Sequence, residues 1–259
     1  MMLNFLVNLA RYDSWQGKLL RLPLNLLPKK TPVRIISGKS RGKKWIVGST
    51  DHGAWLGTYE SVKQDTFVRF VRKNMIVYDI GAHVGIYTLL SSILVGNKGH
   101  VIAFEPLPEN LNYLYKHINL NDLSNVRVIE AAISDMTGFF NFSIGSSSTT
   151  GQLNETGDLI VQTFTLDEVV LRDKLPLPDV IKIDIEGAEA KALRGAVDIL
   201  TKSSPVIFLA THGETVCEEC RTLLASYGYS MTPLEGDKTD SEFVVERVDV
   251  YGDMNCLER

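Results

Sequence analysis

The chain has 259 residues, of which 44% are hydrophobic and 22% are charged, values typical of a domain with a well-buried core. These values exclude a disordered chain, a collagen and a coiled coil. The formal net charge of −4 argues against a protein that binds nucleic acid through a globally basic surface. Three cysteines, an odd number, favour a reducing compartment and a cytoplasmic location.

The N-terminal region, taken as an extension or cap over residues 1–60, differs in pattern from the rest of the chain. Residues 3–10 are apolar and run into Arg11 and Asp13 without a small-residue cleavage site, which indicates a short amphipathic helix rather than an export signal. Strand-like runs at 33–36 and 44–47 flank a Gly/Ser turn, and seven basic residues crowd into 29–44. Such a run is usually a solvated face. The alternatives are peripheral contact with an anionic membrane or a phosphorylated substrate, and a homodimer interface at the leucine-rich start.

Residues 61–259 are predicted to form one α/β domain, because short β-branched runs alternate with helical patterns as in a mostly parallel sheet covered by helices on both faces. The strand-like runs are 75–78, 100–104, 126–129, 180–183, 205–209 and 242–246. The helical patterns are 86–95, 109–119, 187–200 and 215–227. Two further runs, 138–144 and 159–164, predict a two-stranded excursion, whose polar tip at 145–151 is either a loose hairpin or a lid.

Residues 77–88 carry the pattern of a cofactor-binding corner. An apolar strand passes through Asp79, Gly81 and Gly85 into a helix, and Glu105 ends the next strand 20 residues beyond Gly85. In a doubly wound sheet an acid at this position can accept hydrogen bonds from both ribose hydroxyls of a nucleotide-derived cofactor. The alternative is that the two glycines only pack the helix and that Glu105 is a solvated strand-end acid.

The loop composition favours one kind of cofactor. His83 stands where a dinucleotide fingerprint has its middle glycine, so the backbone seat for a pyrophosphate is lost. Asp79 adds a negative charge, which would repel a phosphate but would suit the ammonium and sulfonium groups of S-adenosylmethionine. The sequence therefore predicts S-adenosylmethionine as the cofactor.

A set of ordered motifs resembles the FkbM family of S-adenosylmethionine-dependent methyltransferases over roughly residues 55–235. These motifs are the segments 79–85, 104–106, 108–119, 132–135, 182–189 and 212–214. The resemblance implies a Rossmann-like, seven-stranded class I methyltransferase fold and O-methylation of a sugar or secondary-metabolite hydroxyl. It also implies that residues 55–60 close over the cofactor. The resulting cofactor-binding set is Tyr59, Glu60, Asp79, Gly81, Ala82, His83, Gly85, Glu105, Pro106, Ala132, Ile133 and Asp184.

Candidate catalytic residues follow the fourth and fifth strand-like runs of the alternating pattern, because ligands of an open parallel sheet gather at the carboxyl ends of its strands. His212 is the preferred general base, since imidazole titrates near neutrality, and its alternative role is a hydrogen-bonded turn histidine. Asp184 and Glu186 would share one side of an extended segment and hold the substrate hydroxyl, the methionine amine or a cation. Two carboxylates and one histidine could bind Mg²⁺ or another metal, but no motif or spacing demands one, so no metal ligand is assigned. Glu189 is read as a first-turn acid that favours the helix dipole.

The predicted function is S-adenosylmethionine-dependent O-methylation of a carbohydrate, such as a glycan or exopolysaccharide unit, or of a small metabolite. One alternative is an RNA or DNA methyltransferase, against which stand the acidic balance and the lack of an RNA-binding module. The other alternative is a non-catalytic, cofactor-binding scaffold.

Overall fold

The computed structural model describes residues 27–143, 152–153, 157, 159–234 and 241–248. Among these residues no helix combines the length and apolarity that a membrane span requires. The predicted N-terminal helix at 3–10 and the whole polar tip at 145–151 lie outside the described residues.

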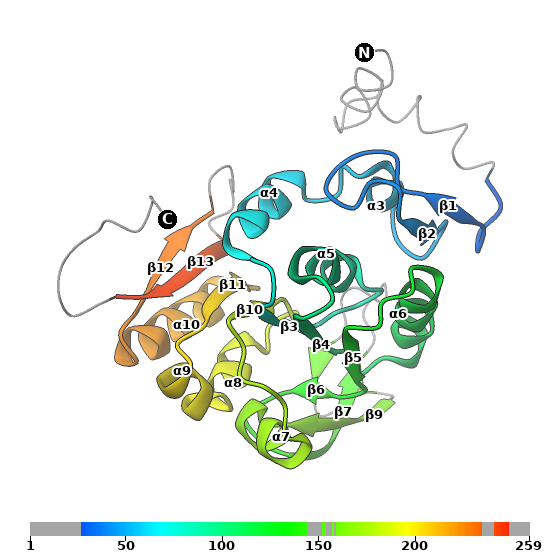
Figure 1. Cartoon of the computed structure of the whole chain (residues 1–259). Helices are drawn as coiled ribbons and strands as arrows, with labels where there is room; N and C mark the ends of the chain where they lie inside the picture. The colour runs from blue at the N-terminus through cyan, green and yellow to red at the C-terminus, as the bar shows by residue number, and fades with distance from the viewer. Residues whose placement is uncertain (1–26, 144–151, 154–156, 158, 235–240, 249–259) are drawn as a thin grey trace.

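A central sheet of seven strands organises the described chain (Figure 1). Its order is β12-β13-β11-β10-β3-β4-β5, and every neighbouring pair is parallel except those formed by β13, which is antiparallel to β11 and β12. The strands are β3 (Ile76–Ile80), β4 (His100–Phe104), β5 (Val126–Ile129), β10 (Val180–Ile183), β11 (Val206–Ala210), β12 (Tyr229–Pro233) and β13 (Glu242–Arg247). The predicted mostly parallel α/β sheet is confirmed, and β12 is a strand that the sequence patterns did not reveal.

Helices cover both faces of the sheet because its inner strands are apolar on both sides. On one face lie α4 (Ser61–Phe70), α5 (Ile86–Val95) and α6 (Pro108–Leu120), packed on residues such as Val77, Val101 and Ala103. On the other face lie α7 (Leu166–Asp173), α8 (Glu189–Arg194), α9 (Val197–Lys202) and α10 (Glu214–Ser226). This arrangement leaves the carboxyl ends of the parallel strands free of helices, where a ligand can bind.

The helix predicted at 187–200 is divided into α8 and α9 in the structure. The break falls at Gly195, where a Cβ atom would lie 2.2 Å from the carbonyl oxygen of Ser134. The close approach of a neighbouring chain segment therefore decides the break, and the apolar periodicity carries no sign of that segment.

The predicted two-stranded excursion is part of a four-stranded sheet. Its strands β7 (Gly138–Ser143) and β9 (Leu159–Phe164) are antiparallel, as predicted, and β6 (Ala132–Ile133) and β8 (Gln152–Leu153) complete the order β6-β9-β7-β8. Phe142 and Val161 pack on Leu107 in a small apolar cluster. The cluster fixes this second sheet beside the carboxyl end of β4.

The N-terminal extension packs on the helix layer through its own apolar cluster. Here β1 (Pro32–Arg34) and β2 (Lys44–Ile46) form an antiparallel pair, followed by α3 (His52–Leu56). Trp45 is fully buried and stacks on the ring of His117 from α6, with centroids 3.7 Å apart. Trp55 joins the same cluster with Val84, which belongs to the loop after β3. The extension therefore contacts the segment predicted to bind the cofactor.

Candidate active site

The candidate site lies where four parallel strands end side by side. Ile80, Phe104 and Ile183 are aligned in the register of β3, β4 and β10, so the next residues, Gly81, Glu105 and Asp184, meet at one edge. His212 follows two residues after the end of β11. The topology thus brings together the acids and the histidine that the sequence places at strand ends.

Glycine is required at two positions of the β3–α5 loop. Gly81 has φ +77°, and a Cβ atom there would lie 2.1 Å from the carbonyl oxygen of Asp184. Gly85 has φ +96°, and a Cβ atom there would lie 2.6 Å from Cδ1 of Leu114. Gly81 therefore allows the loops after β3 and β10 to touch, whereas Gly85 seats α5 against α6.

The Glu105 carboxylate ties together the loops that follow β3 and β4. Its Oε2 accepts the His83 N–H at 2.8 Å, and its Oε1 accepts the Leu107 N–H at 2.9 Å and Nδ2 of Asn110 at 3.1 Å. Burial raises the pKa of this carboxyl, and the three hydrogen bonds oppose the shift. Glu105 is only 4% exposed, yet it lines a cleft at the strand ends. Its remaining acceptor capacity can therefore serve a ligand there.

Most of the predicted cofactor-binding residues line this cleft, together with apolar side chains of Ile86, Leu107 and Phe142. The predicted residues in the lining are Tyr59, Glu60, Gly81, Ala82, His83, Glu105, Pro106, Ala132, Ile133 and Asp184, and Glu186 lines it as well. Burial lowers the pKa of His83 to about 4, so its ring is neutral at physiological pH. Its buried Nε2 atom has no hydrogen-bond partner within the described chain. A neutral donor or acceptor is thus available to a ligand.

Asp79 and Gly85 are not among the residues that line the cleft. The Asp79 side chain is fully buried, where its Oδ2 accepts the Thr88 hydroxyl at 2.6 Å and its Oδ1 lies 3.6 Å from Nζ of Lys182. Direct contact of Asp79 with a cofactor ammonium, as the loop pattern suggested, is thus not what the structure shows. Asp79 instead pairs with Lys182, whose side chain lines the cleft.

Two buried lysines, one of which lines the cleft, were missed by the sequence reasoning. Nζ of Lys63 lies 2.8 Å from Glu242, 3.6 Å from Glu60 and 3.7 Å from Asp184. Nζ of Lys182 lies 3.7 Å from Asp184 and donates to the carbonyl of Gly81 at 3.0 Å. A lysine within the otherwise apolar strand β10 was a usable signal, because a charge inside such a run requires a buried partner. Lys63 on α4 gave no comparable signal in the sequence.

The charges connected by these ion pairs are mainly negative. They comprise three basic side chains, Lys63, Lys182 and His212, and six acidic ones, Glu60, Asp79, Asp184, Glu186, Glu189 and Glu242. Even with His212 protonated, the acids outnumber the bases. The cleft is therefore suited to a ligand with positive charge and unsuited to a pyrophosphate.

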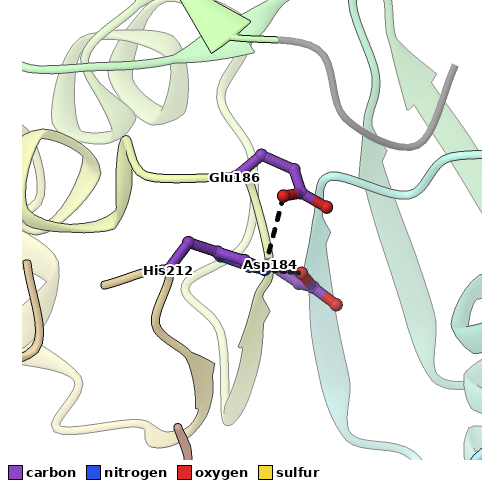
Figure 2. A group of neighbouring side chains, drawn as sticks. All are labelled: Asp184, Glu186 and His212. Carbon is purple, nitrogen blue, oxygen red and sulfur yellow. Dashed lines mark ion pairs between the residues drawn. The ribbon is translucent and has the colours of Figure 1, made fainter. Parts of the chain in front are cut away.

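The side chains of Asp184, Glu186 and His212 lie close together (Figure 2), and of the three Asp184 and Glu186 line the cleft. Nε2 of His212 lies 3.7 Å from Oδ1 of Asp184 and 3.5 Å from Oε2 of Glu186. The expected extended geometry is wrong, because Glu186 adopts φ +55° and the chain turns there. Burial opposes ionisation of Asp184, but Lys182 and Lys63 outweigh it and lower its pKa to about 2. Burial also raises the pKa of Glu186.

Glu189 anchors the opposite nitrogen of His212. Its side chain is fully buried, and its Oε1 lies 2.8 Å from Nδ1 of His212 and accepts the N–H groups of Ile185 and Gly187. The hydrogen bond to Glu189 raises the pKa of His212. Glu189 does begin α8, as expected of a first-turn acid, but its contact with His212 adds a role that sequence position alone does not reveal. With Nδ1 as the donor, Nε2 is left facing the cleft acids.

Ligand atoms of Asp184, Glu186 and His212 all lie within 4.8 Å of one another, a spacing compatible with a metal ion. However, the ammonium groups of Lys63 and Lys182 both lie 3.7 Å from Oδ2 of Asp184. They offset part of the negative charge at Asp184. The three side chains are therefore placed where they can ligate a cation or exchange a proton through His212.

This sheet order, with an antiparallel β13 inserted between β11 and β12, and a cleft at the ends of β3 and β4, define a Rossmann-like class I methyltransferase. The family model of the FkbM methyltransferase domain matches residues 79–231, and the chain belongs to this family of S-adenosylmethionine-dependent methyltransferases. Two features of the cleft suit S-adenosylmethionine. The excess of acidic side chains suits its positive charge, and Glu105, at the end of β4, is placed where a ribose could be bound.

Individual relatives share parts of the chain. Hexuronic acid methyltransferase AglP of Haloferax volcanii is 25% identical over 174 residues, which cover 66% of this chain and 70% of AglP. The mitochondrial rRNA methyltransferase 2 of Schizosaccharomyces pombe is 30% identical over 101 residues, covering 30% of this chain and 46% of that protein. A solved FkbM methyltransferase from Methylobacillus flagellatus is 16% identical, with a TM-score of 0.49, over 76% of this chain. The chain spans 55% of the length of that protein.

Proposed function

We propose that this methyltransferase O-methylates a hydroxyl group of a carbohydrate, or of a small metabolite with sugar-like hydroxyls. The observation that carries the proposal is the Glu189–His212 pair beside the cleft, with Nδ1 of His212 held at 2.8 Å and Nε2 turned toward Asp184 and Glu186. The relative AglP acts on a hexuronic acid by name, which supports a sugar acceptor.

The presence of a candidate base favours a hydroxyl over a carboxylate as the methyl acceptor. A carboxylate is ionised at neutral pH and needs no proton acceptor, whereas an alcohol must lose its proton during attack. Nε2 of His212 can take this proton when the ring is neutral, and Glu189 stabilises the imidazolium that results. Asp184 and Glu186, which face the same nitrogen, can then orient the acceptor hydroxyl.

S-adenosylmethionine supplies an electrophilic methyl group on a positively charged sulfur. Under this proposal Glu105 accepts hydrogen bonds from the ribose hydroxyls, and the acidic excess around Asp184 attracts the positive charges of the bound cofactor. His83, Pro106, Ala132 and Ile133 line the cleft beside Glu105 and are assigned to the adenosine. Tyr59 and Glu60, which precede α4, are assigned to the cover over the cofactor.

The test is a mass-spectrometric methyl-transfer assay with a panel of methyl glycosides and uronic acids as acceptors. We expect a sugar hydroxyl to be methylated, and His212→Asn to lower turnover by ~10²–10⁴-fold, the usual effect of losing a general base. His100→Asn serves as the matched control, because His100 is exposed at the other end of β4. Full activity of His212→Asn would remove the base, and methylation of RNA oligonucleotides alone would overturn the carbohydrate assignment.

A further inference from the structure

A basic surface on the N-terminal extension has no part in the proposed chemistry. Residues 27–50 contain seven basic residues and no Asp or Glu, although the whole chain has a net charge of −4. Four basic side chains, defined here as the basic surface, are exposed together on β1, β2 and α6. They are Lys30, which lies in the turn just before β1, together with Arg34, Lys44 and Lys116.

The strand register places these charges on one face. Arg34 lies directly opposite Lys44, and Pro32 lies opposite Ile46 two residues along the same face. Lys30, Lys116 and Asn119 line a shallow groove with Pro32, Ile46 and Leu120, so this groove continues the face that carries Arg34 and Lys44. The basic surface therefore borders a groove that is half apolar.

The charges of the basic surface are not balanced within the described chain. None of its four side chains forms an ion pair there, although Lys39 nearby pairs with Asp65. Like charges directly opposite each other on a β ladder are destabilising. An anionic partner would relieve this repulsion.

We propose that the basic surface docks on an anionic phospholipid membrane. The groove combines lysines with apolar residues, as a lipid headgroup and its acyl boundary require. The sequence just before it, residues 1–26, is rich in leucine and contains only Asp13 as an acid, so it could supply the second, apolar membrane signal. A nucleic acid is less suited, because Trp45, the aromatic residue of β2, is buried and unable to stack on bases.

The test is co-sedimentation of the full chain with phosphatidylcholine vesicles containing about a quarter phosphatidylglycerol, compared with vesicles of phosphatidylcholine alone. The test variant is Lys30→Gln/Lys44→Gln/Lys116→Gln. The control variant, Lys73→Gln/Lys98→Gln/Lys191→Gln, removes the same charge from exposed lysines elsewhere. At ~1 kcal/mol for each basic residue near an anionic surface, each removed charge lowers binding by about fivefold.

We expect the full chain to bind the anionic vesicles only, and the test variant to bind them at least ~20-fold more weakly than the control variant. Raising NaCl to about 0.5 M should release the wild-type chain, because exposed charges are then screened. Equal binding by the two variants would overturn the proposal. So would the absence of vesicle binding, or a charge-dependent affinity for an RNA duplex without affinity for vesicles.

Discussion

In the proposed mechanism His212 accepts a proton, and its basicity depends on one buried side chain. Glu189 raises the pKa of His212 above its ordinary value of 6.5 through a hydrogen bond to Nδ1. A base is active only when it is unprotonated, so kcat/KM should rise with pH through a value above 6.5. Below that value the imidazolium blocks proton transfer.

Glu189→Gln should move this limb of the pH profile to lower pH, because the neutral amide can still accept from Nδ1–H but no longer stabilises the imidazolium. The pH dependence of kcat/KM for the wild-type and variant enzymes measures the shift. A merely structural role for Glu189 would lower activity equally at every pH. An unmoved limb would therefore contradict the positioning role.

The sequence predicted that His212 and Asp184 lie near one another, because both residues follow strands of one parallel sheet. They could not give the interactions that tune these groups. The Asp79 side chain points into the protein interior, where it contacts Lys182 and Thr88. Lys63 lies on α4, far from Asp184 in the sequence, yet its ammonium group contacts Asp184. Such contacts arise from tertiary packing, which a local pattern does not encode.

The loop between β3 and α5 contains two glycines that contact different parts of the structure. Gly81→Ala would press a Cβ atom against the backbone of Asp184, whereas Gly85→Ala would press it against the movable end of the Leu114 side chain. Both positions also have positive φ, which costs a non-glycine residue of order 1 kcal/mol or more. Gly81→Ala should therefore be the more destabilising change.

Urea unfolding monitored by circular dichroism measures the two free energies of unfolding. Gly81→Ala should also reduce affinity for S-adenosylhomocysteine, since it separates the loops that border the cleft, while Gly85→Ala should change that affinity less. The reverse order in both measurements would show that Gly81 does not set the distance between these loops.

The sequence predicted the helices and strands whose signal is local. It missed the helix ends and short strands that depend on packing against other segments. The helix α5 and the strands β4, β5 and β10 have the predicted bounds, because apolar runs and glycine boundaries specify them. The division of α8 from α9 at Gly195 and the short strand β6 depend on segments distant in sequence. The turn at Glu186 likewise follows from the packing of the site.

For the whole molecule, the N-terminal extension is coupled to the sheet through Trp45. This side chain is 1% exposed and stacks on His117, whose Nε2 accepts the Ile46 N–H at 3.1 Å and whose Nδ1 lies 2.7 Å from the carbonyl of Val84. Val84 belongs to the loop between β3 and α5. The extension is thus joined to the candidate site by packing and by hydrogen bonds.

Trp45→Ala should lower the free energy of unfolding by about 3–5 kcal/mol, the usual cost of removing a large buried aromatic side chain. Chemical denaturation measures this loss, and Phe139→Ala, which removes an aromatic side chain that is 72% exposed, provides the control. A change below about 1 kcal/mol would show that the extension contributes little to the stability of the fold.

The most direct test of the account is calorimetric titration of S-adenosylhomocysteine into the wild-type protein, Glu105→Gln and the control Glu109→Gln, which alters an exposed acid in the first turn of α6. The wild-type and control proteins should bind with the same affinity and should not bind NAD. Glu105→Gln should bind at least ~10-fold more weakly, because a charged acceptor contributes about 1.5–3 kcal/mol per hydrogen bond. Equal affinity in Glu105→Gln, or saturable binding of NAD in place of S-adenosylhomocysteine, would contradict the assignment of the cleft.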